Sequence, residues 1–134
     1  MLYLDTDVLV NFFIQQNKDK HDLAGRIFEQ ASAQGSIFVS FLVLQELSFV
    51  LGKLNMPASE ISANVNGLAL LQPYAYHLGE YHRAVYLTES GGFQNINDCL
   101  HTAIAERNCD ELVTFNMSDF SKIKSFTNLK ITLL

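Results

Sequence analysis

The stretch Leu2–Asp7, LYLDTD, places two carboxylates directly after a short apolar run. We predict a buried strand at Leu2–Leu4, because its residues are apolar without the alternation of a half-exposed strand. From Val8 to about Gln15 the apolar pattern is broad and predicts a buried helix. A strand that leads straight into a helix is typical of an α/β domain, and the acids at this junction require an explanation.

The rest of the chain alternates helices with short strands. Further strands are predicted at residues 36–40, 111–115 and 130–134, helices at 23–33, 41–54, 58–71, 78–88 and 95–108, and a short turn or helix at 117–123. Short apolar strands favour a parallel sheet that is covered on both faces. We therefore expect an α/β fold, a three-layer α/β/α sandwich with a mostly parallel central sheet.

Length and composition bound the domain organisation. Of the 134 residues 49% are hydrophobic, so we expect residues 1–134 to form a single domain with its own core. The first residues carry no basic segment, and no apolar run reaches the ~18 residues of a membrane span, so neither a secretory signal nor a membrane partner is expected. Cys99 falls on the predicted helix at 95–108 and Cys109 directly follows it, too far apart for a disulfide, which favours reduced thiols and a cytoplasmic protein.

Acidic and amide side chains follow two of the predicted strands. Asp5 and Asp7 come after the first strand, and Asn116 and Asp119 come after the strand at 111–115. Ligands of an open parallel sheet bind beyond the carboxyl ends of its strands. We therefore expect these side chains to approach one another at that edge.

Two further acids lie on predicted helices. Glu46 falls within FLVLQELSFVL, where the residues three and four positions away are all apolar. An unpaired carboxylate on such a face is costly unless another group neutralises it. Asp98 lies in the first turn of the helix at 95–108, in NINDCLHTAIAE.

Each acid also has an ordinary structural explanation. Asp5 could accept backbone N–H groups in a turn, Asp7 could cap the first helix, and Asp119 could begin a short helix. Asp98 could complement a helix dipole. His101, three residues after Asp98, is interpreted as a surface or packing residue rather than a site residue.

Charge counting links the acids to one another. The chain has 14 acids and 9 bases, and the excess equals the five acids of one candidate cluster: Asp5, Asp7, Glu46, Asp98 and Asp119. Clustered carboxylates repel one another and need cations, and hard oxygen ligands suit Mg²⁺ or Mn²⁺. Zinc is disfavoured because the histidines and cysteines show no zinc-binding spacing.

The order of these motifs resembles the PIN-domain nuclease family. The matching segments are LDTDVLVNF, Glu46 in LVLQELSFVL, Asp98 in NDCLHTAIAE, and LVTFNMSDF. The size is similar to that of the VapC-type toxins of prokaryotic toxin–antitoxin pairs. The resemblance implies that Asp5, Glu46, Asp98 and Asp119 are the catalytic and metal-binding residues. It gives supporting roles to Thr114, as an orienting hydroxyl, to Asn116, as a neutral site member, and to Asp7, which stands where the family often has asparagine.

The function implied by this resemblance is that of a divalent-metal-dependent endoribonuclease, which uses Mg²⁺ or Mn²⁺ to hydrolyse RNA phosphodiester bonds. The implied partners are RNA, a cognate antitoxin protein and a second copy in a homodimer. The net charge of −5 argues against simple electrostatic binding of nucleic acid, since the basic residues are scattered and cluster only loosely at Lys18/Lys20 and Lys122/Lys124.

Two other functions stay open. The two aspartates also resemble those of haloacid-dehalogenase-like phosphatases, with Asp5 as nucleophile, Asp7 as general acid and Ser40 in a second motif. That family has a hairpin flap after its aspartates, whereas VLVNFFIQQ predicts a continuous helix. The other alternative is a non-catalytic PIN-like binding module.

Overall fold

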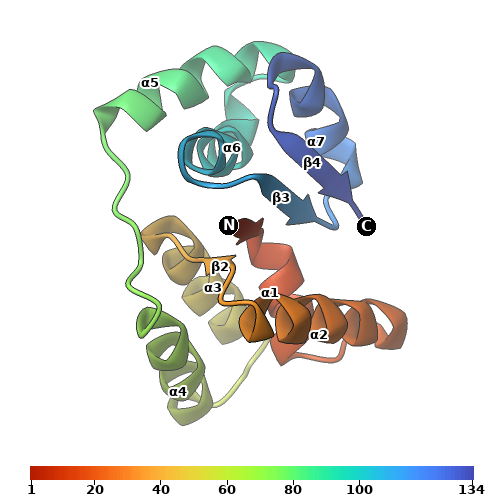
Figure 1. Ribbon diagram of the computed structural model, residues 1–134. Helices are drawn as coiled ribbons and strands as arrows, with labels where there is room; N and C mark the ends of the chain where they lie inside the picture. Colours follow the sequence, from red (N-terminus) through yellow and green to blue (C-terminus); the bar gives the residue numbers. More distant parts are fainter.

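The computed structural model describes residues 1–134 and has a parallel four-stranded sheet at its centre (Figure 1). The strands are β1 (Leu2–Leu4), β2 (Ile37–Phe38), β3 (Glu111–Thr114) and β4 (Lys130–Leu133), in the spatial order β2-β1-β3-β4. The chain first moves from β1 to β2 on one side and later crosses to β3 on the other. The boundary between β1 and β3 is therefore the switch point at which open α/β sheets bind their ligands.

The register of the sheet brings the ends of β1 and β3 together. Leu4 pairs with Val113, and the backbone N–H of Asp5 donates to the carbonyl of Val113 at 3.0 Å. Asp5 and Thr114 therefore leave the sheet side by side, although they are 109 positions apart in the sequence.

Helices cover the sheet on two sides. They are α1 (Thr6–Phe13), α2 (Lys18–Ala33), α3 (Phe41–Lys53), α4 (Ala58–Ala69), α5 (Leu78–Leu87), α6 (Ile96–Asn108) and α7 (Met117–Ile123), with short 3₁₀ turns at Thr88–Ser90, Phe93–Asn95 and Lys124–Phe126. Figure 1 shows α5, α6 and α7 on one side, and α1 to α4 on the other. The predicted three-layer α/β/α sandwich is confirmed.

Element boundaries differ most from the sequence prediction in three places. Helix α1 begins at Thr6 rather than Val8, because Asp5 caps its first turn. Helix α2 begins at Lys18, well before the predicted start, because Asn17 accepts a hydrogen bond from the N–H of Lys20. The strand predicted at 36–40 shortens to β2, since Ser40 leaves the sheet to form an isolated bridge with Tyr74 and to cap α3.

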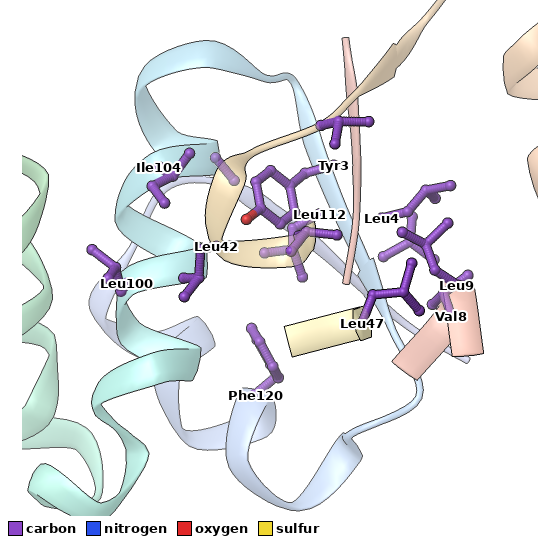
Figure 2. Packing of buried hydrophobic residues seen from close by; sticks show 14 of the residues in the cluster. Tyr3, Leu4, Val8, Leu9, Leu42, Leu47, Leu100, Ile104, Leu112 and Phe120 are labelled. Carbon is purple, nitrogen blue, oxygen red and sulfur yellow. The ribbon is translucent and has the colours of Figure 1, made fainter. Parts of the chain in front are cut away.

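The core lies between the sheet and both helical layers. Its 27 buried apolar residues come from every strand and from all seven α-helices, and Tyr3, Leu47, Leu112 and Phe120 are completely buried among them (Figure 2). Both cysteines are free. None of the helices combines the length and apolar character needed to cross a membrane.

Candidate active site

A pocket of about 790 Å³ opens at the carboxyl ends of β1 and β3. Its polar lining includes Asp5, Asp7, Glu46, Asp98 and Asn116, so the structure brings these sequence-predicted residues to one place. They reach the pocket from the β1–α1 junction, from the middle of α3, from the first turn of α6 and from the residue that caps α7. No lysine or arginine lines the pocket.

Asp5 is buried at the junction of strand and helix. It is the N-cap of α1, and its Oδ1 accepts a hydrogen bond of 2.8 Å from the N–H of Thr6. The hydroxyl of Thr114 donates to the other oxygen, Oδ2, also at 2.8 Å. The capping role that the sequence suggested for Asp7 therefore belongs to Asp5, because the helix begins one residue after it.

Asp7 connects α1 to the segment after β3. Its Oδ2 accepts from the backbone N–H of Phe115 at 3.0 Å and lies 3.3 Å from the Thr114 hydroxyl. Burial, and then the nearby charge of Asp5, raise the pKa of Asp7 to about 7. Two carboxylates so placed cannot both be ionised at neutral pH without a cost in stability.

Glu46 is the most fully hydrogen-bonded acid of the pocket. Its Oε2 accepts from the Thr6 hydroxyl at 2.7 Å and from His101 Nε2 at 2.6 Å, and its Oε1 accepts from Asn97 Nδ2 at 2.8 Å. Burial alone would raise the pKa of this carboxyl, but the hydrogen bonds, led by that of His101, hold it below its ordinary value. These donors explain how α3 can carry a carboxylate within an apolar stretch.

Asn116 links the remaining two acids. Its side-chain Nδ2 lies 3.3 Å from Asp98 Oδ2 and 3.1 Å from Asp119 Oδ2, while Asn95 Nδ2 donates to Asp119 Oδ1 at 3.2 Å. Asp119 does not line the pocket itself. The pKa of Asp98 is raised to about 7 by burial and then by the charge of Asp5.

The donor set suits a hard cation. The protein side chains do not form a ready group of three or more acids, histidines or cysteines around one point. Nevertheless, Asp7 and Asp98 have pKa values of about 7 beside Asp5, and no basic side chain lines the pocket to offset the charge. Carboxylate and amide oxygens are the ligands that Mg²⁺ and Mn²⁺ prefer. Asp5, Asp98 and Glu46 are the residues that would hold such an ion, with Asp119 behind Asn116.

Several residues of the site were not predicted from the sequence. Thr6, Asn97 and His101 all donate to Glu46, and Asn95 donates to Asp119. Of the surface or packing role expected for His101, the surface part is wrong, because only 1% of the residue is exposed, and the buried ring also contacts Glu46 of the pocket. The spacing of three residues between Asp98 and His101 could have placed both on one face of α6.

The fold and the site define a class of protein: a parallel α/β domain with a carboxylate-lined pocket at its switch point. A model of the PIN domain family matches residues 2–125, and the chain belongs to that family. PIN domains are generally nucleases. The resemblance inferred from the motifs is thereby confirmed, and the direct start of α1 after Asp5, where the phosphatase family has its flap, argues further against that alternative.

The comparison with solved structures supports the same fold. Four chains match, one of them in the crystal structure of VapBC2 from Rickettsia felis bound to a DNA fragment from its promoter. The TM-score to that chain is 0.73 at 21% sequence identity, over 100% of this chain and 99% of the other. No functionally curated protein matches this chain.

Proposed function

We propose that the protein is a divalent-metal-dependent endoribonuclease that hydrolyses RNA phosphodiester bonds, and that it is the toxin of a type II toxin–antitoxin pair. Membership of the PIN domain family supports nuclease chemistry. The observation that carries the proposal is the pocket in which Asp5, Glu46 and Asp98 meet without any basic side chain. An acidic pocket cannot accept a phosphodiester unless cations bind first.

The catalytic and metal-binding roles are assigned to Asp5, Glu46, Asp98 and Asp119. A bound Mg²⁺ or Mn²⁺ supplies Lewis-acid chemistry, activating water and stabilising charge on the phosphate. Thr114 orients Asp5 through its 2.8 Å hydrogen bond and lies close to Asp7. Asn116 fixes the distance between the carboxylates of Asp98 and Asp119, because its amide contacts both.

The raised pKa values of Asp7 and Asp98 should make metal binding depend on pH. With pKa values of about 7, each carboxyl holds a proton for much of the time in the metal-free protein at neutral pH. Binding of a divalent cation favours the ionised carboxylates and therefore releases protons. Metal affinity should consequently rise between pH 6 and pH 8.

The proposed partners are RNA, a cognate antitoxin and a second copy of the chain. The Rickettsia felis neighbour is VapBC2 bound to promoter DNA, which supports an antitoxin partner for a chain of the same fold. Tyr81 and Tyr86 are 44% and 51% exposed on α5, and these exposed aromatic side chains are the observation that favours a homodimer. We place this activity in the cytoplasm, where free thiols such as those of Cys99 and Cys109 stay reduced.

The test is cleavage of a panel of structured RNAs by purified protein with Mg²⁺ or Mn²⁺. Cleavage should disappear with EDTA and in Asp98→Asn, which removes the charge but keeps the size of the side chain. Glu60→Gln is the matched control, because Glu60 is an exposed acid on α4 and does not line the pocket. This control should cleave at the wild-type rate.

Two results would contradict the proposal. Cleavage that persists at full rate in EDTA or in Asp98→Asn would separate the activity from the carboxylate pocket. Absence of both cleavage and Mn²⁺ binding, measured by calorimetry, would favour the non-catalytic PIN-like binding module.

A further inference from the structure

A continuous chain of hydrogen bonds runs from the core to Glu46. The hydroxyl of Ser40 lies 2.8 Å from the hydroxyl of Tyr3, which lies 2.7 Å from His101 Nδ1. On the other side of the ring, His101 Nε2 lies 2.6 Å from Glu46 Oε2. Ser40 and Tyr3 are completely buried and His101 is 1% exposed, so water does not reach these three members, and only Glu46, with 23% of its side chain exposed, faces the pocket.

The members of this chain are held by the backbone around them. Tyr3 lies in the middle of β1, which is paired on both sides, and Ser40 also accepts from the N–H of Val43 as the cap of α3. The rings of Tyr3 and His101 meet edge to face, with centroids 5.7 Å apart at 68°. The imidazole therefore has a fixed orientation between the core and the pocket.

The direction of the bond to Glu46 does not depend on the charge of the imidazole. An ionised carboxylate can only accept, so Nε2 must carry the hydrogen that lies between His101 and Glu46. In the neutral ring Nδ1 accepts from the Tyr3 hydroxyl, and Ser40 donates to Tyr3 in turn. In the cationic ring Nδ1 donates to Tyr3, and Tyr3 donates to Ser40.

Counting acceptor positions shows what this bond does to Glu46. A carboxylate oxygen offers about two acceptor positions. Both positions of Oε2 are taken, by Thr6 and His101, while Oε1 accepts only from Asn97. One position therefore remains on this carboxylate, and it is on Oε1.

We propose that His101, held by Tyr3, is a positioning residue that fixes Glu46 so that Oε1 alone is available to the metal ion or to a metal-bound water. This inference rests on the proposed function, because it assigns a role within the same pocket. His101 itself is buried behind Glu46 and does not line the pocket, so it acts through Glu46 rather than on the substrate. Substitution of His101 can remove its hydrogen bond to Glu46, and this makes the proposal testable.

The first readout uses the metal-free protein. The ¹H–¹⁵N spectrum of the imidazole should show a proton on His101 Nε2 that exchanges slowly with water, and Glu46→Gln should shift this resonance. An unprotonated Nε2, or a resonance that Glu46→Gln leaves unchanged, would overturn the proposed bond without reference to any activity.

The second readout is Mn²⁺ affinity by calorimetry in three variants. His101→Leu removes the donor and should weaken binding roughly 10- to 100-fold, the usual effect of losing a partner that orients a metal ligand. His101→Gln places an amide N–H near the position of Nε2 and should recover most of this loss. Ile104→Val, a buried apolar change on the same helix, should leave the affinity unchanged.

A double-variant cycle separates positioning from general damage to the fold. If His101 acts through Glu46, His101→Leu should have no further effect on Mn²⁺ affinity in a Glu46→Gln background. Losses that multiply in the double variant would overturn the proposal, as would equal affinities for His101→Leu and wild type. Wild-type protein that binds no Mn²⁺ and cleaves no RNA would instead remove the proposed function, and this inference with it.

Discussion

At the scale of single residues, Thr114 joins two of the segments that form the pocket. Its hydroxyl donates to Asp5 Oδ2 at 2.8 Å and accepts from the N–H of Asn116 at 2.9 Å. The side chain is completely buried at the end of β3. One hydroxyl thus fixes both a carboxylate from β1 and the backbone that begins α7.

We expect Thr114→Val to destabilise the protein by about 1–3 kcal/mol, because it leaves the Asn116 N–H and one Asp5 oxygen without their buried partner. Urea unfolding of the metal-free protein measures this change. Thr114→Ser keeps the hydroxyl and should restore the hydrogen bonds, with only the smaller loss due to a missing methyl group. A Thr114→Val protein as stable as wild type would show that water replaces the hydroxyl.

At the scale of elements, the β1–α1 junction combines a structural role with a proposed chemical one. Asp5 caps α1 through the N–H of Thr6 and also directs its second oxygen toward Thr114. An asparagine can cap a helix as well as an aspartate can, but it carries no charge. Substitution at this one position can therefore separate the two roles.

Asp5→Asn should fold with at least wild-type stability in EDTA, since it keeps the cap and removes charge beside Asp7 and Asp98. Asp5→Ala should lose about 0.5–2 kcal/mol, because the cap disappears. Both variants should fail to cleave RNA. Thermal unfolding monitored by circular dichroism measures the difference in stability between Asp5→Asn and Asp5→Ala. A strongly destabilised Asp5→Asn protein would show that the charge of Asp5 itself supports the helix.

At the scale of the whole molecule, the acidic pocket makes stability depend on pH. Asp7 and Asp98 have folded-state pKa values of about 7, whereas an unfolded aspartate titrates near 3.9. Between these values the folded state binds more protons than the unfolded state, so stability falls as the pH rises. His101 acts in the same direction: burial lowers its pKa, but the hydrogen bond to Glu46 and the charges of the surrounding carboxylates together outweigh burial and raise it.

We therefore expect the metal-free protein to be less stable at pH 8 than at pH 6, by on the order of 2 kcal/mol. Thermal unfolding in EDTA at both pH values measures this loss. Mg²⁺ should raise the melting temperature more at pH 8, where the carboxylates are ionised and able to bind it. Equal stability at pH 6 and pH 8 would mean that other groups offset the negative charges of Asp7 and Asp98. Glu46, with its lowered pKa, loses its contribution only in acid.

The sequence by itself determined the alternation of strands and helices and the edge at which the acids gather. Hydrophobic periodicity is a local property, so the apolar runs at Leu2–Leu4 and 111–115 predicted strands without knowledge of the fold. The parallel arrangement then predicted that the residues after those strands would meet, because ligands bind at the carboxyl ends of parallel strands. Asp5, Asp7 and Asn116 line the pocket as this reasoning predicted, whereas Asp119 lies behind Asn116 and does not line it.

Only the tertiary structure decided which groups support these acids. Glu46 is held by Thr6, 40 positions earlier, and by His101, 55 positions later, and His101 is held by Tyr3, 98 positions away. Such partners depend on strand order, on register and on how α3 and α6 pack beside β1. These relations join distant parts of the chain, so no local pattern of residues encodes them, and a buried polar network can be identified only when the packed elements are seen together.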